Sequence, residues 1–436
     1  MRVRQSPSLP HGRGADRRGE TARYRDVFAV GEFRALWAAQ VLSVGGDQLA
    51  RVALTVLVYA HTGSALLAAV AYAASIAPQF LGGLLLSGLA DRWPRRSVMI
   101  VCDLARAPLA ALMAVPGMPT GALIGLLCAV TALGAPFGSA RAAIVPDVLG
   151  DAFPLGTAIT MTTYQAAQVA GFVAGGAVVG LFGARAAICI DAGTFLASAA
   201  IVALGVRHRP APAVDRSAPA ADRLAPAADR PAPAADRLAP AADRGAVKNG
   251  EGLLATARLL LGQRAVRVPL LLGLLSAAYN VPEAIAVPLA RAAGGGPVAA
   301  SVVMAAPALG AALGVTAVTM FIGPDLRQRM TAPLAFGACA ILTAAALQPG
   351  LAGILVILLA SGLCDSYQVG ANAAFVAAVP DERRGQAFGL AIAGMQLGQG
   401  AAMILAGAVA SHAGPWLAVT VAGAVGAAAS LLIVFN

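Results

Sequence analysis

The strongest constraint on this chain is the length of its apolar blocks. Runs of Ala, Leu, Val and Gly recur from residue 34 to residue 435, each about 20 residues long, which is the length a helix needs to cross a hydrocarbon core of roughly 30 Å. Only 12% of the 436 residues are charged, too few to cover a water-soluble surface. The blocks also lack the alternating pattern of a membrane β-barrel. The sequence therefore predicts an all-α membrane protein embedded in a lipid bilayer.

The blocks fall into two groups of six predicted transmembrane helices. The first group comprises 34–60, 64–90, 97–115, 120–140, 155–182 and 186–206, and the second comprises 266–290, 297–322, 331–347, 351–376, 386–410 and 415–435. These blocks divide the chain into a disordered tail (1–32), an N-terminal half (33–206), a linker (207–264) and a C-terminal half (265–436). We expect twelve helices in all.

The distribution of charge predicts the topology. The net charge is +10, and the arginines concentrate in the tail, the linker and alternate connections. The remaining connections hold only Arg185 and Arg291. Because cytoplasmic loops carry the excess of basic residues, both termini are expected in the cytoplasm, with the chain in the cell membrane. No basic stripe is interleaved with aromatic residues, so nucleic acid is not an expected partner.

The linker contains a seven-residue repeat. The units PAPAVDR, SAPAADR, LAPAADR, PAPAADR and LAPAADR run from Pro210 to Arg244. A coiled coil is excluded because every unit carries proline and none supplies apolar residues at both core positions. Each unit pairs one Asp with one Arg, so the segment is nearly neutral. The pattern is typical of a solvated, polyproline-like tether between the two halves.

Corresponding residues indicate that the two halves are related. The same offset separates Asp91 from Asp325 and Arg95 from Arg329, and it also separates AAIVPD at 142–147 from VAAVPD at 376–381. One offset thus relates two different connections. This relation predicts a six-helix unit duplicated in parallel orientation.

The connection between the second and third predicted helices carries a family signature. It reads SGLADRWPRRSVMI, which resembles the G-x-L-A-D-R-x-G-R-R loop of the major facilitator superfamily, with Ser87 and Pro94 in place of glycines. A carboxylate at a helix end facing guanidiniums can latch neighbouring helices by charge-assisted hydrogen bonds. The resemblance implies that this loop locks one conformation of an alternating-access cycle; a simple basic turn is the alternative. The predicted latch residues are Asp91, Arg92, Arg95 and Arg96, with Asp325 as the counterpart in the second half.

Further stretches resemble one branch of that superfamily, the enterobactin and macrolide exporters. They are FRALWAAQVLSVGGDQLARVAL at 33–54, HTGS at 61–64, DLAR at 103–106 and PDERRGQAFGL at 380–390. The resemblance implies export of a small amphipathic molecule, such as a drug, siderophore or natural product, by proton antiport. A proton-coupled importer and a non-transporting membrane receptor remain the alternatives.

Glycines recur in the fifth predicted helix. Gly171, Gly175, Gly176 and Gly180 have the spacing that allows two helix backbones to approach closely. They are also similar to the glycine-rich motif of drug antiporters, although Gly176 stands where that motif has a proline. Helix packing and a role in antiport are both open interpretations.

Ionisable residues inside the apolar blocks are the candidate functional residues, because charge in hydrocarbon is costly. Asp47 and Arg51 lie one turn apart in the first block, and Asp365 lies in the middle of the tenth. We expect Asp47, Arg51, Asp365 and Glu283 to take part in substrate binding or proton coupling. A static ion pair between Asp47 and Arg51 is the alternative role for that pair.

The other ionisable residues in the blocks are assigned by depth. Asp103 and Arg106 are predicted to form a structural pair near the cytoplasmic side of the third block. Asp191 is predicted to lie toward the outer side of the sixth.

The sequence offers no catalytic or metal-binding pattern. HExxH, GxSxG and GxxxxGK[ST] do not occur, the four His form no cluster, and the five Cys lie singly inside apolar blocks. We therefore expect neither an enzyme nor a cofactor. The expected partners are a small-molecule substrate, protons and lipid, with the chain as a monomer.

Overall fold

The computed structural model describes residues 24–86, 93–209, 258, 260–380 and 383–435. Within these ranges the regular structure is entirely helical. Nine stretches of described residues are long and apolar enough to cross a membrane, and one of them, 120–182, contains two helices. The chain is an all-α integral membrane protein, whereas the count of twelve helices stays a prediction.

The N-terminal half consists of long helices with one interruption. In chain order it contains α1 (Tyr24–Ala29), α2 (Gly31–Thr62), α3 (Ala65–Ala74), α4 (Pro78–Leu86), α6 (Arg95–Met113), α7 (Thr120–Leu149), η1 (Gly150–Ala152), α8 (Phe153–Phe182) and α9 (Ala184–Gly205). The second predicted span is divided into α3 and α4. Helix α7 continues past its predicted end at 140 to Leu149, so it includes part of the predicted connection.

The C-terminal half is more often broken. It contains α11 (Arg264–Leu274), α12 (Ser276–Tyr279), α13 (Val281–Ala284), α14 (Ala286–Ala292), α15 (Pro297–Phe321), α16 (Pro324–Ala340), η3 (Ile341–Leu347), α17 (Gly350–Cys364), α18 (Tyr367–Ala378), α19 (Arg384–Ala413) and α20 (Pro415–Phe435). The span predicted over 266–290 is four short helices. Prolines at 282 and 288 contribute to these breaks because proline removes a backbone donor.

The last part of the predicted tail is helical. Disorder predicted over 1–32 is wrong for this part, because residues 24–29 form α1 and residues 31–32 open α2. Val27 is fully buried there, so apolar packing holds α1 in place. Residues 1–23, the connection 87–92 and the repeats over 210–257 lie outside the described residues.

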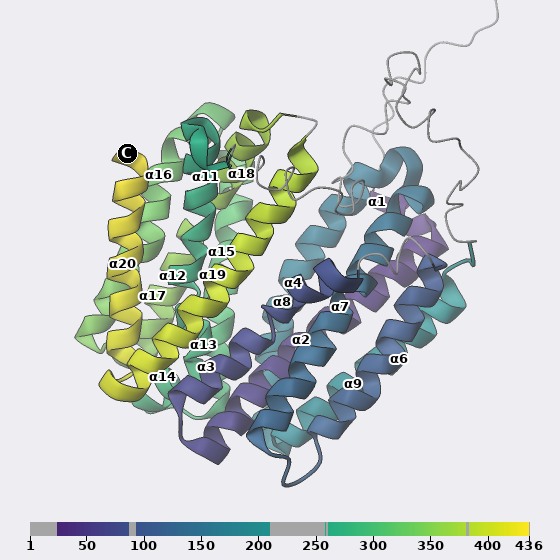
Figure 1. Ribbon diagram of the computed structural model, residues 1–436, viewed down its shortest axis with the longest axis horizontal. Coiled ribbons are helices and arrows are strands. Elements are labelled where there is room, and N and C mark those ends of the chain that lie inside the picture. Colours follow the sequence, from purple (N-terminus) through teal and green to yellow (C-terminus); the bar gives the residue numbers. More distant parts are fainter. Residues whose placement is uncertain (1–23, 87–92, 210–257, 259, 381–382, 436) are drawn as a thin grey trace, which may run out of the picture.

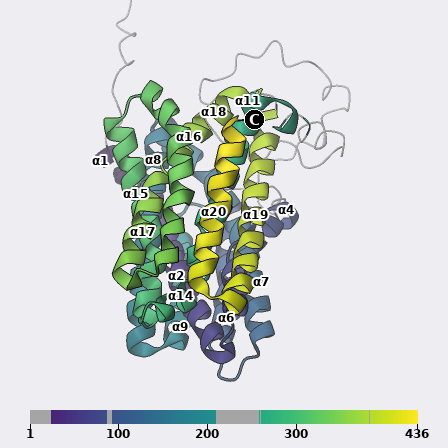
Figure 2. The same cartoon turned by 90° about the vertical axis from the view of Figure 1, so that its left-hand side faces the viewer.

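The two halves form bundles that lie side by side (Figure 1). They contact each other chiefly through α8 with α15 and α3 with α19. We call the end that carries Gly63 and Gly294 the distal end, and the end that carries α1 and the end of α20 the terminal end. The halves lie close at the distal end and spread apart toward the terminal end (Figure 1). Figure 2 shows the C-terminus and the α14 turn at opposite ends of the bundle.

Glycines of α8 determine how closely this helix packs against two partners. A Cβ added at Gly171 would lie 2.8 Å from the Gly45 carbonyl oxygen of α2, and one at Gly175 would lie 3.1 Å from Leu49 Cα. A Cβ at Gly176 would overlap the Ser301 side chain of α15, and one at Gly180 would lie 3.0 Å from Val298 Cγ2. Two glycines thus face α2, and two face the other half of the molecule. In hydrocarbon, such close contact is what holds helices together.

Candidate functional site

Buried charged side chains of the N-terminal half gather around one arginine. We call Asp47, Asp103, Arg106 and Asp191 the Arg106 cluster. Arg106 Nη2 donates a hydrogen bond to Asp47 Oδ1 at 2.7 Å, and Arg106 Nη1 lies 3.6 Å from Asp103 Oδ1. The side chains of Arg106 and Asp103 are 4% and 0% exposed, whereas that of Asp47 is 35% exposed. Asp47 is therefore the accessible member of the two ion pairs.

Arg106 also connects four helices. Its Nε donates to the Val130 carbonyl of α7 at 3.1 Å, and its Nη1 lies 3.4 Å from Ser43 Oγ of α2. Its guanidinium carbon lies 4.0 Å from the centroid of the Phe195 ring of α9. A planar guanidinium has five donors and stacks on aromatic faces, so it can satisfy all these partners at once.

The alternative of a static ion pair between Asp47 and Arg51 is wrong. The structure pairs Asp47 with Arg106 of α6 instead. Arg51 Nη2 donates to the Ser75 carbonyl at 3.4 Å, in the break between α3 and α4, and its guanidinium lies 5.4 Å from the Tyr72 ring centroid. The helical spacing of four residues was compatible with a pair, but the neighbouring helices supply nearer partners.

The separation of Asp103 and Asp191 by depth is also wrong. Asp103 and Arg106 do approach each other as predicted, but they belong to a larger group. A Cβ added at Gly46 would lie 2.5 Å from Asp191 Oδ1, which places this carboxylate against α2 directly beside Asp47. Both acids therefore join the Arg106 cluster, because α9 packs against α2 and α6.

A cavity of about 180 Å³ lies beside this cluster. Asp47, Arg106 and Asp191 contribute to its wall, together with Arg51 and Arg141. Further polar lining comes from Gln40, Ser43, Gln48, Gln79, Thr131 and Tyr164. The first helix thus brings both of its predicted candidates, Asp47 and Arg51, to the cavity.

A second polar group lies in the C-terminal half and reaches the N-terminal half through one hydrogen bond. We call Tyr72, Glu283, Tyr279, Asp365 and Gln368 the tyrosine network. The Tyr72 hydroxyl of α3 donates to the Glu283 carboxylate of α13, so this bond crosses from one half to the other. The Tyr279 hydroxyl donates to Asp365 Oδ1 and accepts from Gln368 Nε2 at 2.9 Å. Both predicted acids of the C-terminal half therefore bind tyrosine hydroxyls.

The acids of the tyrosine network lie at helix breaks. Glu283 belongs to the short α13, and Asp365 lies between α17 and α18. Breaks in a membrane helix free backbone groups that side chains must satisfy. The Tyr367 hydroxyl donates to the Leu272 carbonyl at 2.7 Å, and Ser361 Oγ donates to the Ala338 carbonyl at 2.6 Å. These bonds stabilise irregular backbone beside the acids.

The described latch residues bind the terminal ends of nearby helices. Arg95 Nη1 donates to Asp147 Oδ2 at 3.0 Å and to the Ala143 carbonyl at 2.7 Å, both on α7. Arg96 Nη2 donates to the Ala203 carbonyl of α9 at 2.5 Å. Asp325 is exposed in the first turn of α16. Asp91 and Arg92 lie outside the described residues.

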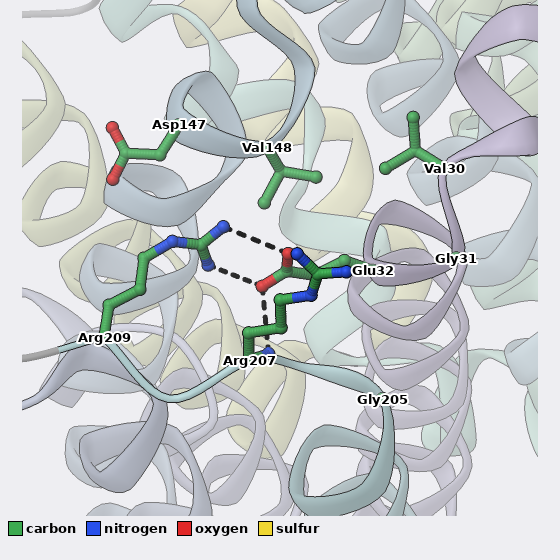
Figure 3. Close-up of a pocket in the computed structure, with 8 residues that line it drawn as sticks. All are labelled: Val30, Gly31, Glu32, Asp147, Val148, Gly205, Arg207 and Arg209. Atoms are coloured by element: carbon green, nitrogen blue, oxygen red, sulfur yellow. Dashed lines mark hydrogen bonds and ion pairs between the residues drawn. The ribbon is translucent and has the colours of Figure 1, made fainter.

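A surface pocket of about 690 Å³ lies at the terminal end of the same half (Figure 3). The Glu32 carboxylate accepts hydrogen bonds from both terminal nitrogens of Arg209 and from the Arg207 backbone N–H at 3.0 Å. Hydrogen bonding to Glu32 raises the pKa of the Arg209 guanidinium. This contact joins the start of α2 to the start of the linker. It could not be expected from the sequence, because Glu32 falls within the predicted tail.

The acids do not make a metal site in the residues that can be described. Over these residues, no three His, Cys, Asp or Glu side chains are placed to hold a metal ion. Since Arg106 lies between its carboxylates, the Arg106 cluster is a network of ion pairs.

Comparison with known proteins gives a consistent result. The sequence model of the Major Facilitator Superfamily matches residues 36–364. Among solved structures, the POT family transporter PepTSo superposes with a TM-score of 0.66 at 12% identity, covering 93% of this chain and 97% of that one. A point mutant of the nucleoside transporter NupG gives 0.64 at 16% identity, with coverages of 93% and 97%.

A third solved structure is a bacterial homologue of the human lysosomal transporter Spinster, in an inward-facing and occupied conformation. It gives a TM-score of 0.65 at 14% identity, covering 95% of this chain and 98% of that chain. No curated protein matches the sequence. At these identities the structural likeness establishes the fold.

Proposed function

Since this chain belongs to the Major Facilitator Superfamily, we propose that it is a secondary active transporter that exports a small amphipathic molecule in exchange for protons. One observation carries the proposal. Glu283, buried in the C-terminal half, accepts a hydrogen bond from Tyr72 of the N-terminal half. A titratable group that bonds across the two halves links protonation to their relative position. Proton-coupled alternating access requires such a link.

The arrangement of the halves supports loading from the cytoplasm. The halves contact each other at the distal end through α3 with α19 and α8 with α15. The excess of basic residues in alternate connections favours cytoplasmic termini by the positive-inside rule. With that orientation, the end at which the halves spread apart faces the cytoplasm, where an exporter takes up its substrate.

The candidate residues then have distinct roles. Asp47 and Arg51 line the cavity and contact substrate, whereas Glu283 gains or loses protons at the contact between the halves and Asp365 does so inside the C-terminal half. The cavity wall combines glutamines with apolar residues such as Met113 and Leu127, which suits an amphipathic molecule. The exporter resemblance of residues 33–54 and 380–390 favours outward flux.

The latch is a further part of the proposal. Asp91, Arg92, Arg95 and Arg96 would hold the terminal ends of α7 and α9 and so lock one conformation of the cycle. In the described residues, Arg95 and Arg96 already bind those ends. The four glycines of α8 would let this helix move against α2 and α15 without side-chain interlocking.

The test begins with a susceptibility panel of amphipathic drugs, comparing cells that overexpress the chain with cells that lack it. A compound whose toxicity is reduced is then followed in inverted membrane vesicles under an imposed pH gradient. We expect gradient-driven accumulation that an uncoupler abolishes. Asp47→Asn, Glu283→Gln and Asp365→Asn should reduce it, whereas Asp151→Asn, at an exposed position in η1, should not. Undiminished accumulation in all three cavity and interface variants would refute the assignment.

Direction is read in intact cells with the same compound. For an exporter, an uncoupler raises cellular accumulation; for a proton-coupled importer, it lowers accumulation. A receptor that transports nothing would show binding without flux in either preparation.

A further inference from the structure

The Arg106 cluster contains more buried carboxyl groups than its guanidinium can neutralise. Asp103 and Asp191 are 0% and 1% exposed, and Asp47 lies beside them. Arg106 is the cation that contacts them in the described structure. An unpaired ionised carboxylate in such a place costs several kcal/mol. Charge balance therefore favours at least one neutral, protonated carboxyl in this cluster.

The hydrogen bonding of Asp103 is compatible with the same conclusion. Both of its carboxyl oxygens are buried, and the nearest guanidinium nitrogen lies 3.6 Å away, beyond ordinary hydrogen-bond length. The Ser198 hydroxyl of α9 lies next to Asp103. This hydroxyl can accept a hydrogen bond from a protonated Asp103 and donate one to an ionised Asp103, so Asp103 keeps a partner in both states.

The groups that face the cluster come from three packed helices. Helix α2 contributes Asp47 and Ser43, and α9 contributes Asp191, Thr194, Phe195 and Ser198. Helix α7 presents the Val130 carbonyl and Gly134 to Arg106. Asp103 therefore has one contacting cation, Arg106, and two further acids nearby. Arg51 of α2 and Arg141 of α7 belong to the cavity wall that Asp47 and Asp191 also line.

The cavity connects this cluster to water. Asp47 and Asp191 line the cavity, whereas Asp103 lies behind them. The missing side chain at Gly46 makes room for the Asp191 carboxylate at this wall. Asp47 and Asp191 are therefore the carboxylates through which the cluster meets the cavity.

We propose that Asp103 and Asp191 bind an exchanged proton and that Arg106 transmits their protonation state to Asp47. This inference rests on the proposed proton antiport and deepens it, because it adds a proton site inside the N-terminal half to the one proposed at Glu283. When the O–H bond of Asp103 breaks, the proton passes to cavity water and the carboxylate becomes charged. Arg106 Nη1 then moves from 3.6 Å into hydrogen bonding with Asp103, and its bond to Asp47 weakens. Asp47 is thereby released to bind a polar group of the substrate.

In this scheme the described conformation is the proton-loaded one. Arg106 bonds Asp47 at 2.7 Å and remains further from Asp103. Arg106 is a positioning residue, because it acts on substrate only through Asp47.

Infrared spectroscopy of the full-length protein in lipid tests the proton site without a substrate. At neutral pH, the difference spectrum between the unmodified protein and Asp103→Asn or Asp191→Asn should contain the C=O stretching band of a protonated carboxyl. Asp151→Asn should give no such band. Asn has the size and shape of the protonated acid, so folding should persist. Asp103→Glu is a second variant, in which the C=O band of the protonated carboxyl should persist at a shifted frequency. Loss of ionised carboxylate bands alone in both Asn variants would overturn the inference.

Transport of the compound found in the drug panel separates this inference from the proposed function. We expect Asp103→Asn to lose gradient-driven exchange and retain downhill flux. Exchange that remains driven by the gradient in Asp103→Asn and Asp191→Asn would refute the proton site and leave antiport standing. Conversely, the protonated band together with flux that ignores the gradient would refute antiport and leave the proton site standing.

Discussion

The two halves of the molecule treat buried acids differently. In the N-terminal half, Asp47 and Asp103 lie beside the guanidinium of Arg106. In the C-terminal half, Glu283 and Asp365 accept hydrogen bonds from the hydroxyls of Tyr72 and Tyr279. Within the described residues, neither Glu283 nor Asp365 forms an ion pair within 4.0 Å.

This difference indicates how each half responds to a proton. A guanidinium stabilises an ionised carboxylate and stays charged at any physiological pH. A tyrosine hydroxyl can donate to an ionised carboxylate and accept from a protonated one. The C-terminal acids can therefore change charge without losing their partner, whereas a change in the N-terminal half must rearrange Arg106.

The largest expected effect is that of Arg106→Ala. Removing one partner of a buried ion pair costs about 3–5 kcal/mol because it leaves charge uncompensated. We expect a free energy of unfolding lower by that amount in detergent. Arg185→Ala, at an exposed position, is the matched control. Equal stability of the two variants would mean that the N-terminal half does not depend on charge pairing.

Tyr279→Phe examines the other half of the comparison. It removes the hydroxyl that bonds Asp365, and an unsatisfied buried acceptor costs about 1–3 kcal/mol. Thermal unfolding should detect this loss. Tyr164→Phe serves as control, because the residue is 41% exposed. A Tyr279→Phe protein as stable as Tyr164→Phe would show that the phenol is not needed by the acid.

Gly46→Ala probes the geometry of the Arg106 cluster with little change in composition. The new methyl group would displace the Asp191 carboxylate and the Thr194 side chain, and such overpacking costs about 1 kcal/mol when side chains can move. Gly45→Ala is the adjacent control, since a Cβ there meets nothing within 4 Å. We expect only Gly46→Ala to alter the infrared carboxyl bands. Identical spectra for the two variants would argue against the placement of Asp191.

The smallest effect concerns the distal turns. Ser64 caps α3 by accepting a hydrogen bond from the Leu67 N–H at 3.3 Å, whereas α15 begins after Gly296 without a side-chain cap. Ser64→Ala should lower stability by about 1 kcal/mol, and Gly296→Ala by less, because Gly296 offers no side-chain hydrogen bond to lose. Calorimetry in the same detergent would compare them. A larger loss of stability for Gly296→Ala than for Ser64→Ala would mean that the start of α15 matters more than the capped start of α3.

Straight helices were predictable from the sequence, and broken ones were not. The spans predicted over 297–322 and 415–435 agree closely with α15 and α20, because length and hydropathy alone define such helices. The span 266–290 satisfied the same criterion, although its backbone is interrupted three times. Pro282 and Pro288 were the available signal, yet proline is also tolerated inside membrane helices.

The candidate site was predictable residue by residue but not in its contacts. Asp47, Glu283 and Asp365 stood out because charge is rare in the apolar blocks. Asp103 and Asp191 were wrongly assigned to different depths. A position along one helix gives no information about the rotation or tilt of that helix. The choice of Arg106 over Arg51 as partner of Asp47 depends on how α6 packs against α2 through their common neighbours. Only the three-dimensional arrangement supplies that information.

The glycine contact between α8 and α15 has a mechanical consequence. Because it lies near the distal end, it can serve as the fulcrum about which one bundle rocks against the other. Helix α8 begins at Phe153, 23 residues before Gly176, which is about 35 Å at 1.5 Å per residue. At that distance a rotation of roughly 10° would move the start of α8 by about 6 Å. A bulky residue at Gly176 would therefore block the rotation of the two bundles at the point where they move least.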